Sequence, residues 1–151
     1  MSLEVGSPVE GLAAALSDVP DPVFSQAMVG PGVAVRPAGG RADAVAPIAG
    51  VVATVHPHAF VVAAPSGTAV LVHLGIDTVK LQGEGFELHV SKGDQVTAGQ
   101  PVVSWDPSGV EAAGYSAVCP VVALDQAPEA LADLREDGPV RAGDTLFAVE
   151  A

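Results

Sequence analysis

The feature that most constrains the fold is a series of short, valine-rich apolar runs, each closed by glycine or proline. The chain has 17 glycines and 13 prolines in 151 residues, and 49% of it is hydrophobic although only 4% is aromatic. Valine favours strands, whereas glycine and proline interrupt regular structure. We therefore expect an all-β fold built from many short strands.

The charge and the apolar pattern bear on partners and location. Six Lys and Arg against 18 Asp and Glu give a formal net charge of −12. Nucleic-acid-binding proteins need basic residues to displace counterions, so we expect no nucleic-acid partner. No apolar run reaches the ~20 residues that span a bilayer, no secretory signal is seen, and Cys119 alone allows no internal disulfide. We expect a cytoplasmic protein.

The chain divides into an N-terminal segment and one domain. Residues 1–17 carry glycine and proline around the small run 12–16. We expect this segment to be loosely held, with a helical turn or two. Residues 18–151 then form a single domain.

One segment of that domain predicts a helix. Asp125 is placed to cap a helix over residues 127–135, with Leu131 and Leu134 as its apolar stripe. Elsewhere, residues 95–102 and 139–146 share the pattern Val-x-x-Gly-x-x-apolar. This weak internal repeat predicts two related β-hairpin modules in one barrel or sandwich.

Residues 70–79 place a reactive side chain in a strongly patterned strand. With a period of two, one face is wholly apolar and consists of Val70, Val72, Leu74 and Ile76. The other face consists of Leu71, His73, Gly75 and Asp77. Neutral imidazole offers a lone pair near pH 7, which makes His73 a candidate for nucleophilic or proton-transfer chemistry. The alternative is a hydrogen-bonded structural histidine.

The turn before this strand decides whether His58 shares the face of His73. Residues 59–64 and 69–74 predict a β-hairpin. Directly opposed residues of an antiparallel pair point to the same face, so a four-residue loop, 65–68, leaves His58 diagonal to His73, whereas an odd loop separates them. A three-residue turn with Gly67 in the left-handed conformation is also stereochemically reasonable, and the sequence leaves the register open.

Two chemistries compete for the cluster of His56, His58, His73 and Asp77. The His-x-His pair with a third histidine and a carboxylate suits tetrahedral zinc. Phosphoryl transfer through an imidazole nitrogen instead needs a neutral nucleophile, a neighbouring donor for the phosphoryl oxygens and an in-line approach.

Several motifs carry a resemblance to a known family. They are His58-Ala59-Phe60, Ser66-Gly67, the run Val-His-Leu-Gly-Ile-Asp-Thr-Val at residues 72–79, and Gly83-Glu84-Gly85-Phe86. The sequence resembles the glucose-type EIIA component of the bacterial phosphoenolpyruvate-dependent sugar phosphotransferase system, with supporting similarity over nearly all the chain after residue 17. The resemblance implies an antiparallel barrel-sandwich hybrid, a duplicated hybrid motif, with one or two short helices.

The resemblance also implies a function and its residues. His73 would accept a phosphoryl group from phospho-HPr, as a phosphohistidine, and pass it to the cysteine of an EIIB domain for sugar uptake of the glucose or N-acetylglucosamine class. His58 would bond the phosphoryl oxygens, and Asp77, Leu71 and Gly75 would belong to the partner-docking face. No metal and no cofactor is implied. We expect a monomer that meets the membrane only through an EIIB/EIIC permease.

Two departures from the family pattern and one alternative remain. Many relatives carry threonine where this chain has His56, and Gly-Asp-Gly where it has Gly30-Pro31-Gly32, so hydrogen bonding around His58 and partner specificity are open. The alternative is a zinc-dependent peptidoglycan metallopeptidase on a similar fold. Such enzymes need a His-x-x-x-Asp ligand set upstream, and no histidine precedes His56.

Overall fold

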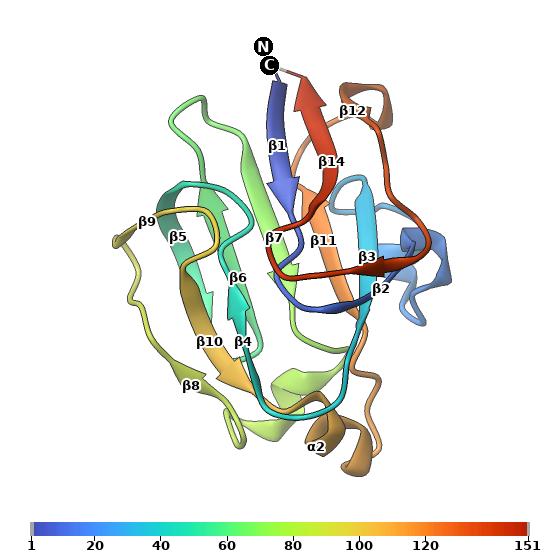
Figure 1. Cartoon of the computed structure of the whole chain (residues 1–151), viewed down its shortest axis with the longest axis vertical. Helices are drawn as coiled ribbons and strands as arrows, with labels where there is room; N and C mark the ends of the chain where they lie inside the picture. The colour runs from blue at the N-terminus through green and yellow to red at the C-terminus, as the bar shows by residue number, and fades with distance from the viewer. Residues whose placement is uncertain (1, 151) are drawn as a thin grey trace.

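The fold is all-β and its strands pair antiparallel. The structure is a computed structural model that describes residues 2–150. Within these residues the strands form three sheets, and there are two short α-helices, α1 (Pro22–Ser25) and α2 (Pro107–Ala112) (Figure 1). The prediction of an antiparallel all-β fold with one or two short helices is confirmed.

The largest sheet has eight strands and the other two have three each. The order in the large sheet is β13 (Pro139–Val140), β2 (Gly11–Ala15), β3 (Gly32–Pro37), β11 (Cys119–Ala123), β7 (Ala69–His73), β6 (Ala59–Ala63), β5 (Gly50–His56) and β9 (Gln95–Val96). One small sheet has the order β1 (Ser2–Gly6), β14 (Thr145–Glu150) and β12 (Leu131–Ala132). The other has the order β4 (Ala42–Val45), β10 (Pro101–Trp105) and β8 (Glu87–Leu88).

The strand order shows an internal duplication. If β1, β2 and β3 are matched to β4, β5 and β6, and β11 to β14 are matched to β7 to β10, each small sheet maps onto the other. The order of the large sheet then reads the same from both ends, with β11 and β7 paired at its centre. The molecule is therefore two similar units, one formed by both ends of the chain and one by its middle.

The repeated sequence pattern falls on equivalent segments of the two units. Each segment starts in an edge strand of the large sheet, turns at a glycine of positive φ (Gly99, +88°; Gly143, +94°), and continues into the middle strand of a small sheet. The repeat is confirmed, but the hairpins are wrong, because β9 and β10 pair with different neighbours and so do β13 and β14. These segments are crossings that join one sheet to another.

Residues 2–15 differ from the loosely held segment that the sequence predicts. Strand β1 pairs with β14, and β2 pairs with both β3 and β13. Val5 and Ala13 are buried, with exposures of 0% and 6%. The run 12–16 has the alanine content of a helix, but the consecutive residues Ala13 and Ala14 are buried in two different apolar clusters, and β2 pairs on both sides, so tertiary context outweighs local propensity.

The predicted helix over residues 127–135 is wrong. A 3₁₀ turn (Pro128–Ala130) is followed by β12, which pairs with β14. Asp133 has φ of +57°, a left-handed conformation that helices do not continue through. Leu131 is buried while Leu134 is exposed, so the two leucines share no helical stripe.

Both true helices begin at an Asp-Pro pair. The side chain of Asp21 accepts a hydrogen bond from the Val23 N–H, and that of Asp106 accepts one from the Ser108 N–H. In each helix the next residue is proline at the first helical position, where the missing N–H has no cost. These pairs are the signal that sequence analysis missed.

The core is divided by the large sheet. The main cluster lies between the sheets and includes Phe60, Trp105 and Phe147, while a smaller one around Phe24 and Val122 lies on the other face of the large sheet, beneath α1.

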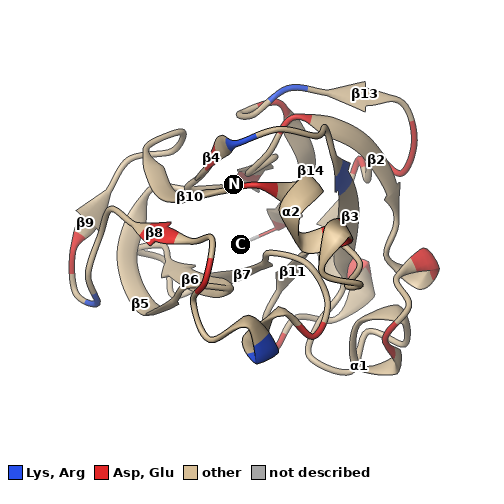
Figure 2. Cartoon of the chain, turned by 90° about the horizontal axis from the view of Figure 1, so that it is seen from below, with Lys and Arg blue, Asp and Glu red and all other residues tan. Residues whose placement is uncertain are grey.

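The Lys and Arg residues of the described chain are scattered over the molecule and form no cluster in the view of Figure 2. Within residues 2–150, no helix is long and apolar enough to cross a membrane.

Candidate functional site

His73 is the last residue of β7. The predicted division is confirmed for residues 70–74, because Val70, Val72 and Leu74 are fully buried while His73 and Leu71 are half-buried on the opposite face. It is wrong for Ile76, which lies beyond the end of the strand and packs in the same cluster as Leu71. Leu71 packs against the small core cluster beneath α1. The strand therefore fixes the His73 backbone and leaves its ring at the surface.

His58 reaches His73 from a turn and not from a strand. It lies with Pro57 in the two-residue turn between β5 and β6. The centroids of the His58 and His73 rings are 5.3 Å apart, with the planes at 65°, so the edge of one ring faces the plane of the other. The Leu74 N–H donates to the His58 carbonyl at 2.7 Å and holds this turn against β7.

The hairpin register differs from the one that favoured this proximity. Ala63 pairs with Ala69, and beyond this pair the Ala64 N–H donates to the Thr68 carbonyl at 2.8 Å, so the turn has three residues, 65–67, with Gly67 at φ of +96°. The four-residue loop is wrong, and strand alternation alone would separate the two histidines. They meet because His58 lies beyond the end of its strand, where alternation no longer applies.

A hydrogen bond fixes the proton position on His73. Its Nδ1 lies 2.5 Å from the Gly75 carbonyl oxygen. A carbonyl oxygen can only accept, so Nδ1 donates and carries the proton in this geometry. The lone pair of neutral His73 is therefore on Nε2.

The loop that supplies this carbonyl requires glycine. Gly75 has φ of +82°, and a Cβ there would lie 2.7 Å from the Thr78 Cγ2 and 2.8 Å from the Ser116 carbonyl oxygen. The loop is held on both sides, because the buried Thr78 hydroxyl donates to the Leu74 carbonyl and the Ile76 N–H donates to the Ser116 carbonyl. The acceptor of His73 is thus rigidly placed.

Burial favours the neutral form of both imidazoles. Burial lowers the pKa of His73 below its usual value near 6.5, opposed by its bond to Gly75 and by the charges of Asp21 and Asp77. Burial is also the largest cause that lowers the pKa of His58, and the charges of His73 and His56 lower it further. A neutral imidazole is the form with a free lone pair.

Phe24 and Asp21 are site residues that sequence reasoning missed. The Phe24 ring lies against His73, with centroids 5.3 Å apart and planes at 58°. Phe24 belongs to α1, and Asp21, the cap of that helix, acts on His73 by its charge. The Asp21-Pro22 pair is the signal that could have placed this helix.

Two of the other predicted residues lie on the loop that follows β7. Gly75 supplies the carbonyl acceptor described above. Asp77 is exposed, at φ of +62°, and its side chain makes no capping bond to the 3₁₀ turn (Thr78–Leu81) that follows. Three apolar side chains of these segments are exposed: Val79 lies on that turn, Val23 lies in α1, and Met28 follows α1. We call these three residues the apolar rim.

The four donors of the alternative zinc site do not converge. Among residues 2–150, no group of three His, Cys, Asp or Glu side chains is placed to hold a metal ion. His56 and His58 instead stack ring on ring, with centroids 5.8 Å apart.

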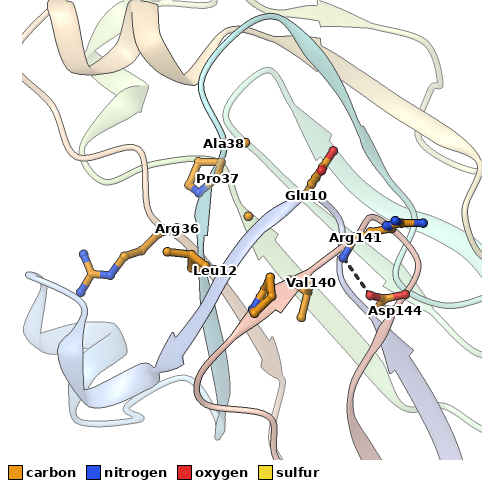
Figure 3. A pocket seen from close by; sticks show the side chains of 10 residues that line it. Glu10, Leu12, Arg36, Pro37, Ala38, Val140, Arg141 and Asp144 are labelled. Atoms are coloured by element: carbon orange, nitrogen blue, oxygen red, sulfur yellow. Dashed lines mark hydrogen bonds between the residues drawn. The ribbon is translucent and has the colours of Figure 1, made fainter.

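Cavities of about 570, 420, 230 and 180 Å³ lie elsewhere, and neither His58 nor His73 lines any of them. Figure 3 shows the 570 Å³ cavity, where the side chains of Arg36 and Arg141 point away from each other around an apolar floor that includes Leu12 and Val140. Within residues 2–150, the histidine pair therefore lies outside these four cavities.

An all-β duplicated fold with a histidine pair at its surface defines the class of protein. The sequence matches the family described as phosphoenolpyruvate-dependent sugar phosphotransferase system, EIIA 1, over residues 3–128. The chain belongs to this family.

Individual relatives agree with the family match. The chain is 41% identical to the glucose-specific EIIA component of Oceanobacillus iheyensis, over 80% of this chain and 73% of that protein. It is 37% identical to the beta-glucoside-specific EIIBCA component of Bacillus subtilis, over 96% of this chain and 24% of that protein. The solved structure of glucose permease IIA from Mycoplasma capricolum matches with a TM-score of 0.90 at 33% identity, over 98% of this chain and 96% of that one. The chain spans about a quarter or less of the length of the EIIBCA relatives.

Proposed function

We propose that this chain is a phosphocarrier whose His73 accepts a phosphoryl group from phospho-HPr and passes it to the cysteine of an EIIB domain. The observation that carries the proposal is the bond from His73 Nδ1 to the Gly75 carbonyl, because it directs the lone pair of a neutral imidazole to Nε2. This nitrogen is then the nucleophile, and the phosphohistidine is the intermediate.

The transfer needs no co-reactant. His73 Nε2 attacks the phosphorus of the donor phosphohistidine, a new N–P bond forms, and the N–P bond of the donor breaks. In the second step the EIIB thiolate attacks the same phosphorus, and His73 leaves as neutral imidazole. No cofactor or metal takes part, since the chemistry is positioning and charge stabilisation.

His58 is the group beside the transferred phosphoryl. Its ring lies 5.3 Å, centroid to centroid, from that of His73, which is close enough for a ring N–H to reach an oxygen of a group on Nε2. A hydrogen bond to a charged acceptor is worth about 1.5–3 kcal/mol. His58 therefore stabilises the phosphoryl group and its onward transfer.

The surroundings suit a protein partner. The apolar rim, with half-buried Leu71 beside His73, offers a surface that a second protein can cover and from which it excludes water. Asp77 is exposed at its edge, where a basic side chain of HPr or EIIB can pair with it.

The relatives' names support a sugar permease as the partner. Those names include glucose-specific, mannose-specific and beta-glucoside-specific components, some of them EIIBCA chains. We propose the glucose and N-acetylglucosamine class that the sequence resemblance implies, with the chain acting as a monomer in the cytoplasm and meeting the membrane through EIIB and EIIC.

Labelled phosphoenolpyruvate tests the function. With EI and HPr present, the chain should acquire an acid-labile, alkali-stable label, and the His73→Ala variant should acquire none. The His89→Ala variant is the matched control, because it removes an imidazole that bonds Ser104 far along the chain from the pair. Label that persists in His73→Ala would rule out the assignment.

A further inference from the structure

A third imidazole extends the pair into a row. His56 is the last residue of β5, and its ring stacks on the His58 ring with centroids 5.8 Å apart and planes at 23°. The His58 ring therefore has His56 over one side and the His73 ring at 5.3 Å, in edge-to-face contact. The three rings come from β5, the following turn and β7.

The His58 ring depends on this packing for its orientation. Its backbone is fixed, because the His58 carbonyl accepts a hydrogen bond from Leu74. Within residues 2–150, however, no hydrogen bond to the His58 ring nitrogens is formed, in contrast to His73 and His89. The neighbouring rings are then what limits the rotation of the His58 side chain.

We propose that His56 is a positioning residue for phosphoryl transfer, whose ring holds the His58 ring edge-on to His73 and so sets how well His58 donates to the phosphoryl group. The proposal rests on the phosphocarrier function proposed above. It gives a role to a histidine that the two-histidine site leaves without one.

The charges around the row add a second effect of the same residue. Burial is the first cause that lowers the pKa of His58, followed by the charges of His73 from β7 and His56 from β5, while Asp21 and Asp77 act on His73. A protonated His56 disfavours a proton on His58, so removing the His56 charge raises the pKa of His58. The stack and the charge can therefore be separated by substitution.

Two variants separate them. His56→Phe keeps a flat ring on His58 and removes the charge, whereas His56→Ala removes both. His56 is exposed, so neither change disturbs the core. His89→Ala again serves as the control, because His89 bonds Ser104 and not the row.

The experiment measures two quantities in each variant. The first is the titration midpoint of His58, followed by NMR in the unphosphorylated protein, which should rise in both His56 variants and stay unchanged in His89→Ala. The second is onward transfer to EIIB, which should slow about three- to tenfold in His56→Ala, the size of one aromatic contact, and recover in His56→Phe. Acceptance from phospho-HPr should change less than onward transfer.

The results distinguish this inference from the function on which it rests. If the unchanged protein accepts no phosphate, the proposed function fails, and the His58 titration still tests the charge effect of His56. If the unchanged protein transfers phosphate but His56→Ala transfers it equally fast, the inference is overturned. No recovery in His56→Phe also overturns it, whereas an unchanged His58 midpoint in both variants contradicts the charge effect.

Discussion

At the scale of single residues, one hydrogen bond decides which atom of His73 reacts. The Gly75 carbonyl accepts a hydrogen bond from Nδ1–H, so the proton stays on Nδ1 and Nε2 is the free nitrogen. Burial then favours the neutral ring by lowering its pKa. The donor group beside it, His58, is a separate side chain that can be changed without touching the nucleophile.

The His58→Ala variant should divide the two half-reactions. It keeps His73 and its bond to Gly75, so acceptance from phospho-HPr should continue. Onward transfer should fall about 10- to 100-fold, because one hydrogen bond to a charged group is lost. Single-turnover rates with HPr and with EIIB measure the two steps.

His58→Gln is the matched control for that experiment, since its amide keeps an N–H donor. It should recover part of the onward rate. Equal impairment of both half-reactions in His58→Ala would contradict this division of roles.

The sequence predicts on which face of the strand His73 lies, but it does not predict which residues lie beside it in space. The alternation of Val70, Val72 and Leu74 is local and directly readable. The approach of His58 depends on a turn where alternation ends, and the contact of Phe24 depends on a long-range packing. Neither contact produces a periodic pattern in the sequence.

At the scale of elements, the site depends on the loop that follows β7. Gly75 lies at positive φ where a Cβ would meet Thr78 and the Ser116 carbonyl. The loop must therefore move if a side chain is added, and the acceptor of His73 moves with it.

Gly75→Ala should lower the free energy of unfolding by about 1–3 kcal/mol, as expected for left-handed strain and close contact. It should also slow acceptance of phosphate, because the Nδ1 proton loses its acceptor. Gly85→Ala is the control, since Gly85 has φ of +86° with open space around it. Chemical denaturation and the labelling rate measure both effects, and equal activity of the two variants would contradict this role of the loop.

The helices show how local signals can mislead or be overlooked. The leucine spacing at residues 131 and 134 predicts a helix, yet pairing with β14 produces a strand. The Asp-Pro pairs at Asp21 and Asp106 are genuine helix starts, but the helices are too short to show an apolar period.

At the scale of the whole molecule, the duplicated topology explains why the segments near both ends of the chain form paired strands of the sheets. Strand β1 from the N-terminal end pairs with β14 from the C-terminal end, and β2 completes the large sheet beside β3. The repeat of glycine turns is visible in the sequence, whereas the pairing of distant ends is not.

Deleting residues 2–6 should destabilise the protein by several kcal/mol. The deletion removes β1 and the fully buried Val5, a side chain worth about 1.5–3 kcal/mol of burial, and uncovers β14. Thermal unfolding measures the loss. Glu4→Ala, at an exposed position of the same strand, should stay within about 0.5 kcal/mol of the unchanged protein. An unchanged melting temperature after the deletion would support a loosely held segment instead.

The attachment atom of the phosphoryl group tests the account most directly. The phosphorylated protein, uniformly labelled with ¹⁵N, can be examined by NMR for coupling between phosphorus and a ring nitrogen. Because Gly75 holds the Nδ1 proton, we predict coupling to Nε2 of His73. A phosphoryl group on Nδ1 of His73, or on any other residue, would contradict the proposed mechanism.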